Sequence, residues 1–166
     1  MSPHTEKISS AALINSNWGH LLTFDASEHR LAIQLGGSKP EELARCAVWA
    51  EQSGFDEVNL NVGYPSDRAQ SGPFGACLML EPERVAACVA TMRQAVSVPV
   101  TVKTRIGVDE QDSYDELTRF VSLLQDVGLE QLTVHARKAW QSTQRVFNQT
   151  VLSLGLTRLS RVTPSS

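Results

Sequence analysis

The fold of this chain is decided around residues 57–68, which read EVNLNVGYPSDR. Residues 57–61 close an apolar run and are typical of a buried strand, and Gly63 and Pro65 then interrupt the backbone. Two asparagines and the Asp67–Arg68 pair seldom gather at such a point for packing reasons alone. The stretch therefore predicts a buried strand that opens into a reaction site.

Strands and helices alternate along the chain on both sides of this stretch. Two capping boxes and a proline indicate helix starts, and two glycines indicate helix ends. The expected strands are 31–35, 57–61, 98–103 and 131–135, with a weaker one within 8–14, and the helix signals are Ser38–Glu41, Gly54, Pro82, Ser113–Glu116 and Gly128. Such alternation indicates a parallel sheet joined by right-handed crossovers. A β/α barrel and a doubly wound sheet both satisfy the pattern.

Four of the expected strands end in polar side chains, which are Gln34, Asn61, Lys103 and His135. In a parallel α/β fold the carboxyl ends of the strands share one edge, and ligands bind at that edge. The alternative is that polar residues simply mark the points where strands meet solvent. Motifs of a Rossmann dinucleotide site, a Walker A loop, a zinc protease or a serine hydrolase do not occur. We therefore predict an α/β protein with parallel strands alternating with helices, and the polar strand ends suit a β/α barrel better than a doubly wound sheet.

The composition is that of an ordinary globular domain, with 42% hydrophobic and 20% charged residues. The three cysteines, Cys46, Cys77 and Cys88, have no metal-binding spacing, so we expect core thiols, no metal and a cytoplasmic location. We also expect no membrane span and no signal peptide. The net charge of −3 disfavours a globally basic nucleic-acid binder, although residues 131–166 carry five Lys/Arg and no acid. That basic end either faces a polyanion or is a tail unrelated to the preceding domain.

Six short motifs carry a family resemblance. They are Gln34-Leu-Gly-Gly37, Asn59-Leu-Asn-Val-Gly63, Pro65-Ser-Asp-Arg68, Phe74-Gly-Ala-Cys-Leu-Met79, Val100-Thr-Val-Lys-Thr-Arg-Ile-Gly107 and His135-Ala-Arg-Lys-Ala-Trp140. In this order they resemble the tRNA-dihydrouridine synthases, and within them the DusA-type branch, from about Thr5 to Trp140. The resemblance implies a β/α barrel that holds FMN and reduces a uridine of the tRNA D-loop to dihydrouridine, with NADPH as the reductant.

The resemblance also implies roles for individual residues. Gln34, Lys103 and His135 would bind the flavin, Asn61 would touch the target nucleotide, and Arg137 and Lys138 would lie nearby for phosphate or RNA. Simpler roles stay open, because Gln34 could cap a helix, Lys103 could be a solvated strand-end cation, and His135 could belong to the barrel wall.

The chain departs from the family pattern at Tyr64, the position of the family's proton-donor cysteine. A phenol can be a general acid, but its ring would occupy substrate space, so we expect severely impaired activity. The resemblance ends after Trp140, and the family's phosphate-binding loops are missing beyond it. The resemblance therefore implies an incomplete β/α (TIM-type) barrel, truncated at both ends, in which 1–140 is the partial flavin-binding catalytic domain and 141–166 a divergent, disordered tail.

Three functional hypotheses follow. The first is a flavin-dependent tRNA-dihydrouridine synthase, and the second is a catalytically inactive fragment or isoform that acts through a binding partner. The third, a different FMN- or phosphate-binding β/α protein, is disfavoured because the motifs at 65–68 and 135–138 occur together.

Overall fold

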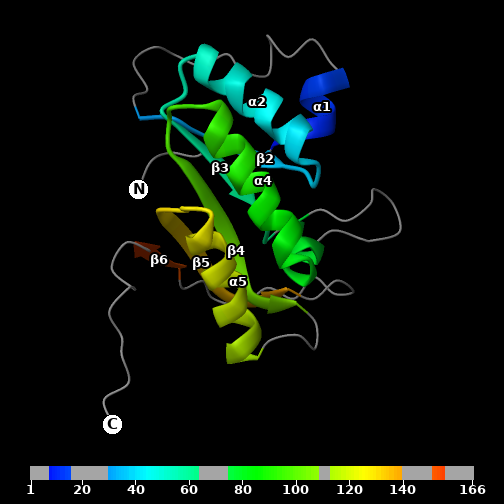
Figure 1. The fold of residues 1–166 in the computed structure, drawn as a ribbon, viewed down its shortest axis with the longest axis vertical. Coiled ribbons are helices and arrows are strands. Elements are labelled where there is room, and N and C mark those ends of the chain that lie inside the picture. The colour runs from blue at the N-terminus through cyan, green and yellow to red at the C-terminus, as the bar shows by residue number, and fades with distance from the viewer. Residues whose placement is uncertain (1–7, 16–29, 64–74, 109–112, 140–150, 156–166) are drawn as a thin grey trace.

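The computed structural model describes residues 8–15, 30–63, 75–108, 113–139 and 151–155, and within 136–139 and 151–155 it describes the backbone. The strands are β1 (Ile8–Ser9), β2 (Ala32–Gly36), β3 (Glu57–Asn61), β4 (Val100–Val108), β5 (Gln131–Ala139) and β6 (Val151–Gly155). The helices are α1 (Ser10–Asn15), α2 (Pro40–Gln52), α4 (Pro82–Ala95) and α5 (Tyr114–Asp126), with a 3₁₀ helix, η2 (Gly75–Leu80). Figure 1 shows these elements in one domain.

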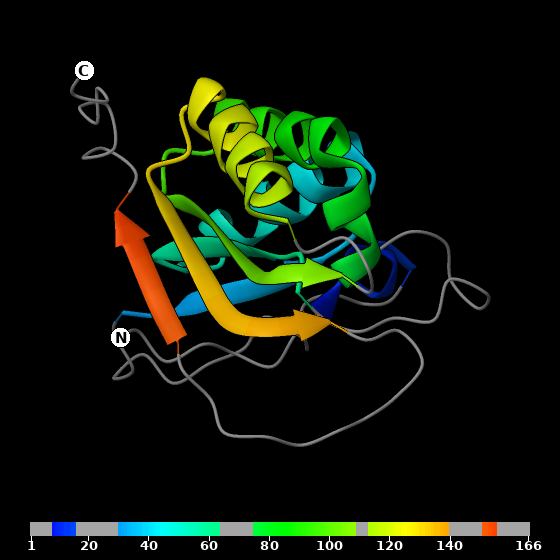
Figure 2. The same cartoon turned by 90° about the horizontal axis from the view of Figure 1, so that it is seen from below.

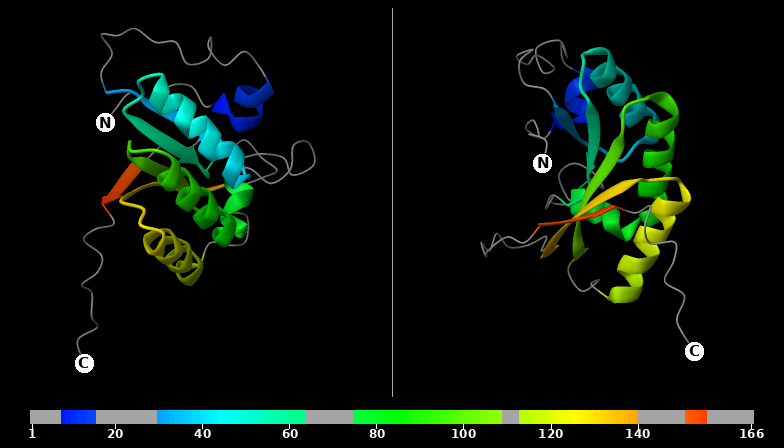
Figure 3. Two further views of the ribbon diagram at one scale, coloured as in Figure 1. Left: turned by 45° about the horizontal axis from the view of Figure 1, so that its top comes forward. Right: turned by 90° about the vertical axis from the view of Figure 1, so that its left-hand side faces the viewer.

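The sheet has the strand order β1-β2-β3-β4-β5-β6, and its first five strands are parallel. Helices α2, α4 and α5 lie side by side on one face of this sheet, as Figures 2 and 3 show. A doubly wound sheet reverses its strand order and places helices on both faces. Sequential order with helices on one face is instead the arrangement of a β/α barrel, and the predicted α/β class of an incomplete TIM-type barrel is confirmed.

The core lies between the helices and one face of the sheet. The strands contribute alternate apolar residues to it, since successive side chains of a strand point to opposite faces. From the sheet they include Ile33, Leu35, Val58, Leu60, Val100, Val102, Leu132 and Val134, and from the helices Leu43, Ala47, Val85, Val89, Met92, Phe120 and Leu124. This packing uses one face of the sheet, and the opposite face takes no part in the core.

Several predicted helix boundaries are confirmed. Ser113 caps α5 in a full capping box, accepting from the Glu116 N–H while the Glu116 carboxylate accepts from the Ser113 N–H. Gly54 and Gly128 follow α2 and α5 with φ of 91° and 79°, conformations that glycine adopts without strain. Helix α4 begins at Pro82, as expected.

Two local predictions were wrong. The capping box at Ser38–Glu41 does not form, because α2 has Lys39 at its N-cap and no side-chain cap. Pro40 forces the residue before it into extended backbone, so Lys39 marks the boundary, and its ammonium pairs with Glu42 at 2.7 Å. The strand expected from Val98 begins at Val100, beyond Pro99, which has no N–H for the ladder.

The ends of the sheet also differ from expectation. The weak strand expected within 8–14 is only the two-residue β1, followed at once by α1. In the segment 141–166, expected to be disordered, residues 151–155 form β6, which pairs antiparallel with β5. The remainder of 141–166 lies outside the described residues.

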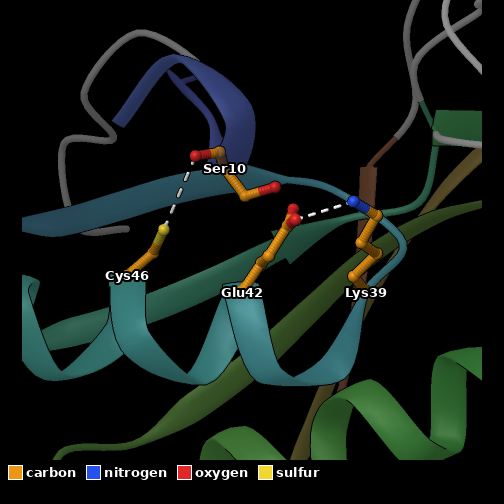
Figure 4. A network of polar contacts seen from close by, with 4 residues as sticks. All are labelled: Ser10, Lys39, Glu42 and Cys46. Atoms are coloured by element: carbon orange, nitrogen blue, oxygen red, sulfur yellow. Dashed lines mark hydrogen bonds and ion pairs between the residues drawn. The ribbon is translucent and has the colours of Figure 1, made fainter. Parts of the chain in front are cut away.

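The short helix α1 packs against α2 and against the turn that precedes it. Ser10 is buried, and its carbonyl oxygen lies 3.9 Å from the Cys46 sulfur, as Figure 4 shows beside the Lys39–Glu42 pair. The Ser10 side chain lies against Gly37, where a Cβ would come within 2.4 Å of the Ser10 Oγ. Only glycine lets the turn after β2 approach α1 this closely.

Candidate functional site

The face of the sheet opposite the helices is polar. Gln34, Asn59 and Thr101 are paired across β2, β3 and β4, and Asn61 is paired with Lys103 one step further along. His135 of β5 is paired with Arg105 of β4. Since residues paired across a ladder point to the same side, these side chains form one surface, here called the polar face: Gln34, Glu57, Asn59, Asn61, Thr101, Lys103, Arg105 and His135.

Five hydrogen bonds link Gly63 and five members of the polar face into a series, here called the amide chain. The Gly63 N–H donates to Asn61 Oδ1 (3.0 Å), Asn61 Nδ2 to Gln34 Oε1 (2.6 Å), and Gln34 Nε2 to Asn59 Oδ1 (3.0 Å). Asn59 Nδ2 then donates to Thr101 Oγ1 (2.8 Å), and Thr101 Oγ1 to Glu57 Oε1 (2.5 Å). Gln34, Asn59, Asn61 and Thr101 are all less than a tenth exposed, so these bonds satisfy groups that would be costly to bury alone.

Two members of the amide chain, Gln34 and Asn61, keep hydrogen-bonding capacity that no other described residue uses. Gln34 and Asn61 each use one amide hydrogen and one oxygen lone pair in the bonds above. A primary amide has two hydrogens and two lone pairs, so each side chain keeps one donor and one acceptor. Such a set suits a planar ligand whose edge carries both carbonyl and N–H groups, as flavins and uracil do.

Lys103 is half-buried on the polar face, and among the described residues no hydrogen bond or ion pair with another residue engages its ammonium. A cation in this position, beside the buried amide of Asn61, favours an anion or a developing negative charge on a bound ligand.

The loop that leaves β3 is held at both sides of Gly63. Its N–H is bound by Asn61, and its carbonyl accepts from Arg105 Nε at 2.6 Å. A Cβ at Gly63 would lie 3.2 Å from Arg105 Cγ and from the Thr104 carbonyl carbon, so the strand of β4 closely abuts this residue. The residue before position 64 is therefore fixed in place.

The structure brings Gln34, Asn61, Lys103 and His135 to one face, while the other predicted site residues are less fully described. Arg137 and Lys138 lie on β5, where Arg137 falls within the irregularity in register and Lys138 is paired with Gly107 beyond it, and their backbone alone is described. Tyr64 lies outside the described residues.

Sequence reasoning assigned no individual role to four members of the polar face: Glu57, Asn59, Thr101 and Arg105. Their signal was alternation, since residues 57, 59 and 61 are polar and 58, 60 and 62 are apolar. We had expected polar residues only where strands end, whereas the polar set extends down the strands as a surface. Glu57, Asn59 and Thr101 link the site to the amino-terminal end of β3.

The cysteines do not contribute to the polar face. Burial raises the pKa of Cys46 to about 11 and the pKa of Cys88 to about 11. Cys46, Cys77 and Cys88 are all buried, so the expectation of core thiols is confirmed. A thiol with such a raised pKa is a poor nucleophile at neutral pH.

A hollow of about 290 Å³ lies at the opposite end of the sheet from Gly63. Residues 96–101 line it together with Arg93, Glu130 and Gln131. Ligands of β/α barrels bind at the carboxyl ends of the strands, so this hollow does not compete with the polar face as the functional site.

Fold and polar face together define a β/α-barrel protein whose interior face is polar. The family model described as Dihydrouridine synthase (Dus) matches residues 3–153, and the chain belongs to this family. The tRNA-dihydrouridine(20/20a) synthase of Vibrio parahaemolyticus is 59% identical over 140 residues, covering 84% of this chain and 43% of the relative. The proteins of that name from Escherichia coli (53% over 140 residues, 84% and 42% covered) and Synechocystis (52% over 137 residues, 82% and 41%) are also similar. The chain spans less than half the length of these relatives.

The described part of the chain offers neither a membrane-spanning helix nor a metal cluster. None of its helices has the length and apolar character needed to cross a membrane. Its His, Cys, Asp and Glu residues form no group of three or more that could hold a metal ion.

Proposed function

We propose that the polar face binds the isoalloxazine ring of FMN and that the chain serves FMN-dependent reduction of a D-loop uridine in tRNA, with NADPH as the reductant. The observation that carries this proposal is the half-buried Lys103 beside the amides of Gln34 and Asn61, which keep free hydrogen-bonding capacity. In support, the similar proteins are named tRNA-dihydrouridine(20/20a) synthases.

The hydrogen-bonding groups and the charge of these residues fit FMN. Gln34 would bind the ring edge with its remaining donor and acceptor, Lys103 would hold negative charge near the N1–C2=O region, and His135 would contact the ring. Asn61 would contact the target nucleotide, and Arg137 and Lys138 would bind phosphate or RNA. When bound, FMN supplies the hydride for the uracil ring, which it takes from NADPH.

Tyr64 makes this form severely impaired in our proposal. The reduced base needs a proton, and a phenol of pKa about 10 is a weaker acid at neutral pH than a thiol. Gly63 is held on both sides, so the side chain at position 64 follows a backbone residue that is fixed in place. The ring therefore displaces the base from its reactive position, and a displacement of about 1 Å can reduce a rate about 100-fold.

The second candidate function is that of an inactive family member that acts through a binding partner, and Tyr64 is the feature that favours it. In either case we propose that residues 1–140 form the flavin-binding domain, that tRNA is the macromolecular partner, and that the cytoplasm, where tRNA is modified, is the compartment. The two candidates differ in whether dihydrouridine is formed.

The first experiment is a flavin titration of the purified chain, followed by absorption and fluorescence. We expect FMN to bind, and Lys103→Met to weaken binding about tenfold or more, since a charged hydrogen bond contributes about 1.5–3 kcal/mol. Lys39→Met is the matched control, because Lys39 is exposed at the start of α2 and pairs with Glu42. Binding that is unaffected by Lys103→Met, or equally affected by both variants, would contradict the proposed site.

The second experiment separates the two candidate functions. Dihydrouridine is measured in unmodified tRNA after incubation with FMN, NADPH and either the chain or its Tyr64→Cys variant. We expect little product from the chain and at least about 100-fold more from Tyr64→Cys. No product from a Tyr64→Cys variant that still binds FMN would favour the inactive family member.

A further inference from the structure

The amide chain has a direction, and its two ends determine that direction. At one end stands the backbone N–H of Gly63, which can only donate, and at the other the carboxylate of Glu57, which can only accept. The Gly63 N–H requires an oxygen of Asn61 to face it, and the Glu57 carboxylate requires the Thr101 hydroxyl to point its hydrogen toward it. Every amide between the two ends must then be oriented as it is.

Each hydrogen bond in the series fixes the orientation of the next side chain. Thr101 donates to Glu57, so its oxygen accepts from Asn59 Nδ2, which turns Asn59 Oδ1 toward Gln34. Gln34 Nε2 donates to that oxygen, which turns Gln34 Oε1 toward Asn61. A reversed series would place two acceptors together at Glu57 and two donors together at Gly63, and each such clash leaves a buried group unsatisfied.

We propose that Glu57 is a positioning residue that, together with the Gly63 N–H, fixes the amide orientation of Gln34 and Asn61, and so which side of each amide donates to the ligand. Glu57 lies at the amino-terminal end of β3, two residues before Asn59 and four before Asn61. It acts through Thr101 and Asn59 and touches no ligand itself. That the ligand is a flavin or uracil rests on the proposed function, whereas the orientation itself is a property of the folded chain.

Moving the acceptor-only group from one end of the amide chain to the other tests the proposal. In Asn61→Asp both side-chain oxygens at position 61 accept, so one of them faces Gln34 Oε1, or the series reverses and an acceptor pair forms at Glu57. We expect the equilibrium constant for unfolding in urea to rise about tenfold or more, because one buried acceptor contact is unavoidable.

Glu57→Gln should rescue this loss. A glutamine at 57 can donate to Thr101 Oγ1, so the reversed series is fully bonded in the Glu57→Gln/Asn61→Asp double variant, which also keeps the net charge. Glu57→Gln alone should change stability less than about twofold, because its carbonyl still accepts from Thr101. The matched control is Asn61→Asp/Glu130→Gln, which removes the charge of a side chain that is 74% exposed and outside the amide chain; it should show no rescue.

The outcomes decide the proposal whether or not flavin binds. A double variant as unstable as Asn61→Asp, or rescue by Glu130→Gln to the same extent, would overturn it. If Asn61→Asp does not fold, the double variant must still fold, and a double variant that also fails overturns it. Where the parent chain binds FMN, the restored double variant should bind it about tenfold more weakly, because Gln34 then offers its donor where it offered its acceptor; unchanged affinity would overturn the role toward the ligand. A parent chain that binds no FMN would refute the proposed function and leave the stability cycle to decide the orientation.

Discussion

Gly37→Ala is the substitution whose cost the structure defines most directly. A Cβ at this position would lie 2.4 Å from Ser10 Oγ, 3.1 Å from Ser10 Cβ and 3.2 Å from Leu43 Cδ2. The first distance is far inside van der Waals contact, and the other two are tighter than packed cores normally allow. Ser10 is only 3% exposed and Leu43 is fully buried, so neither side chain has open space into which to move.

The magnitude follows from the ways in which the contact can relax. Rotation of the Ser10 hydroxyl removes the 2.4 Å contact at the cost of its present position, but the contact with Ser10 Cβ remains. Relief then requires α1 to shift away from α2, where the Ser10 carbonyl lies beside Cys46. Overpacking of this kind costs about 1–3 kcal/mol, and we expect a value of about 2 kcal/mol for Gly37→Ala.

The measurement is urea unfolding followed by circular dichroism, with the slope checked for two-state behaviour. Ser10→Gly removes both close atoms, so Gly37→Ala should cost about 1 kcal/mol less in that background than in the parent chain. A loss below about 0.5 kcal/mol for Gly37→Ala, or an equal loss in both backgrounds, would refute the packing argument.

Two more predictions concern helix capping and the buried thiols. Ser113→Ala removes the cap of α5 and should reduce the free energy of unfolding by about 1 kcal/mol, whereas Ser113→Asp should retain most of it; equal losses in urea unfolding would contradict a capping role. Burial raises the pKa of Cys46 and Cys88 to about 11, whereas the thiols of the unfolded chain have a pKa of about 8.5. Between these two pKa values the unfolded chain releases protons that the folded chain keeps. Stability should therefore fall as the pH rises from about 8.5 to about 11. Urea unfolding at about pH 8 and about pH 10 of the parent and of a Cys46→Ala/Cys88→Ala variant should show a smaller fall in the variant, and equal slopes would contradict the burial argument.

The apolar half of the fold could be predicted from the sequence because its signals are local. Helix α5 was placed from its capping box and its glycine stop, and β3 was placed from five consecutive residues. The capping box before α2 failed because a competing local rule prevailed, namely the extended backbone that Pro40 imposes on Lys39. The sequence contains the deciding residue, Pro40, and the prediction gave too little weight to its effect on the backbone of Lys39.

The polar half was only partly predictable because its signals are not local. Gln34, Asn61, Lys103 and His135 could be selected as polar residues at the expected strand ends, although β4 and β5 continue past Lys103 and His135 to Val108 and Ala139. Pairing of Asn59 with Gln34 and Thr101 depends on strand register, which joins residues 25 and 42 positions apart. Register is set by the sheet as a whole, so no window of sequence around Asn59 reveals its partners.

Both the apolar and the polar residues of the sheet hold Gly63, the residue before position 64. The apolar residues of β3 fix the strand, Asn61 then fixes the N–H of Gly63, and Arg105 of the neighbouring strand fixes its carbonyl. Whatever side chain follows Gly63 therefore starts from a point that the sheet determines. A cysteine and a tyrosine at position 64 would begin from the same place and differ in reach as well as in acidity, and in our proposal the longer side chain takes the space of the base.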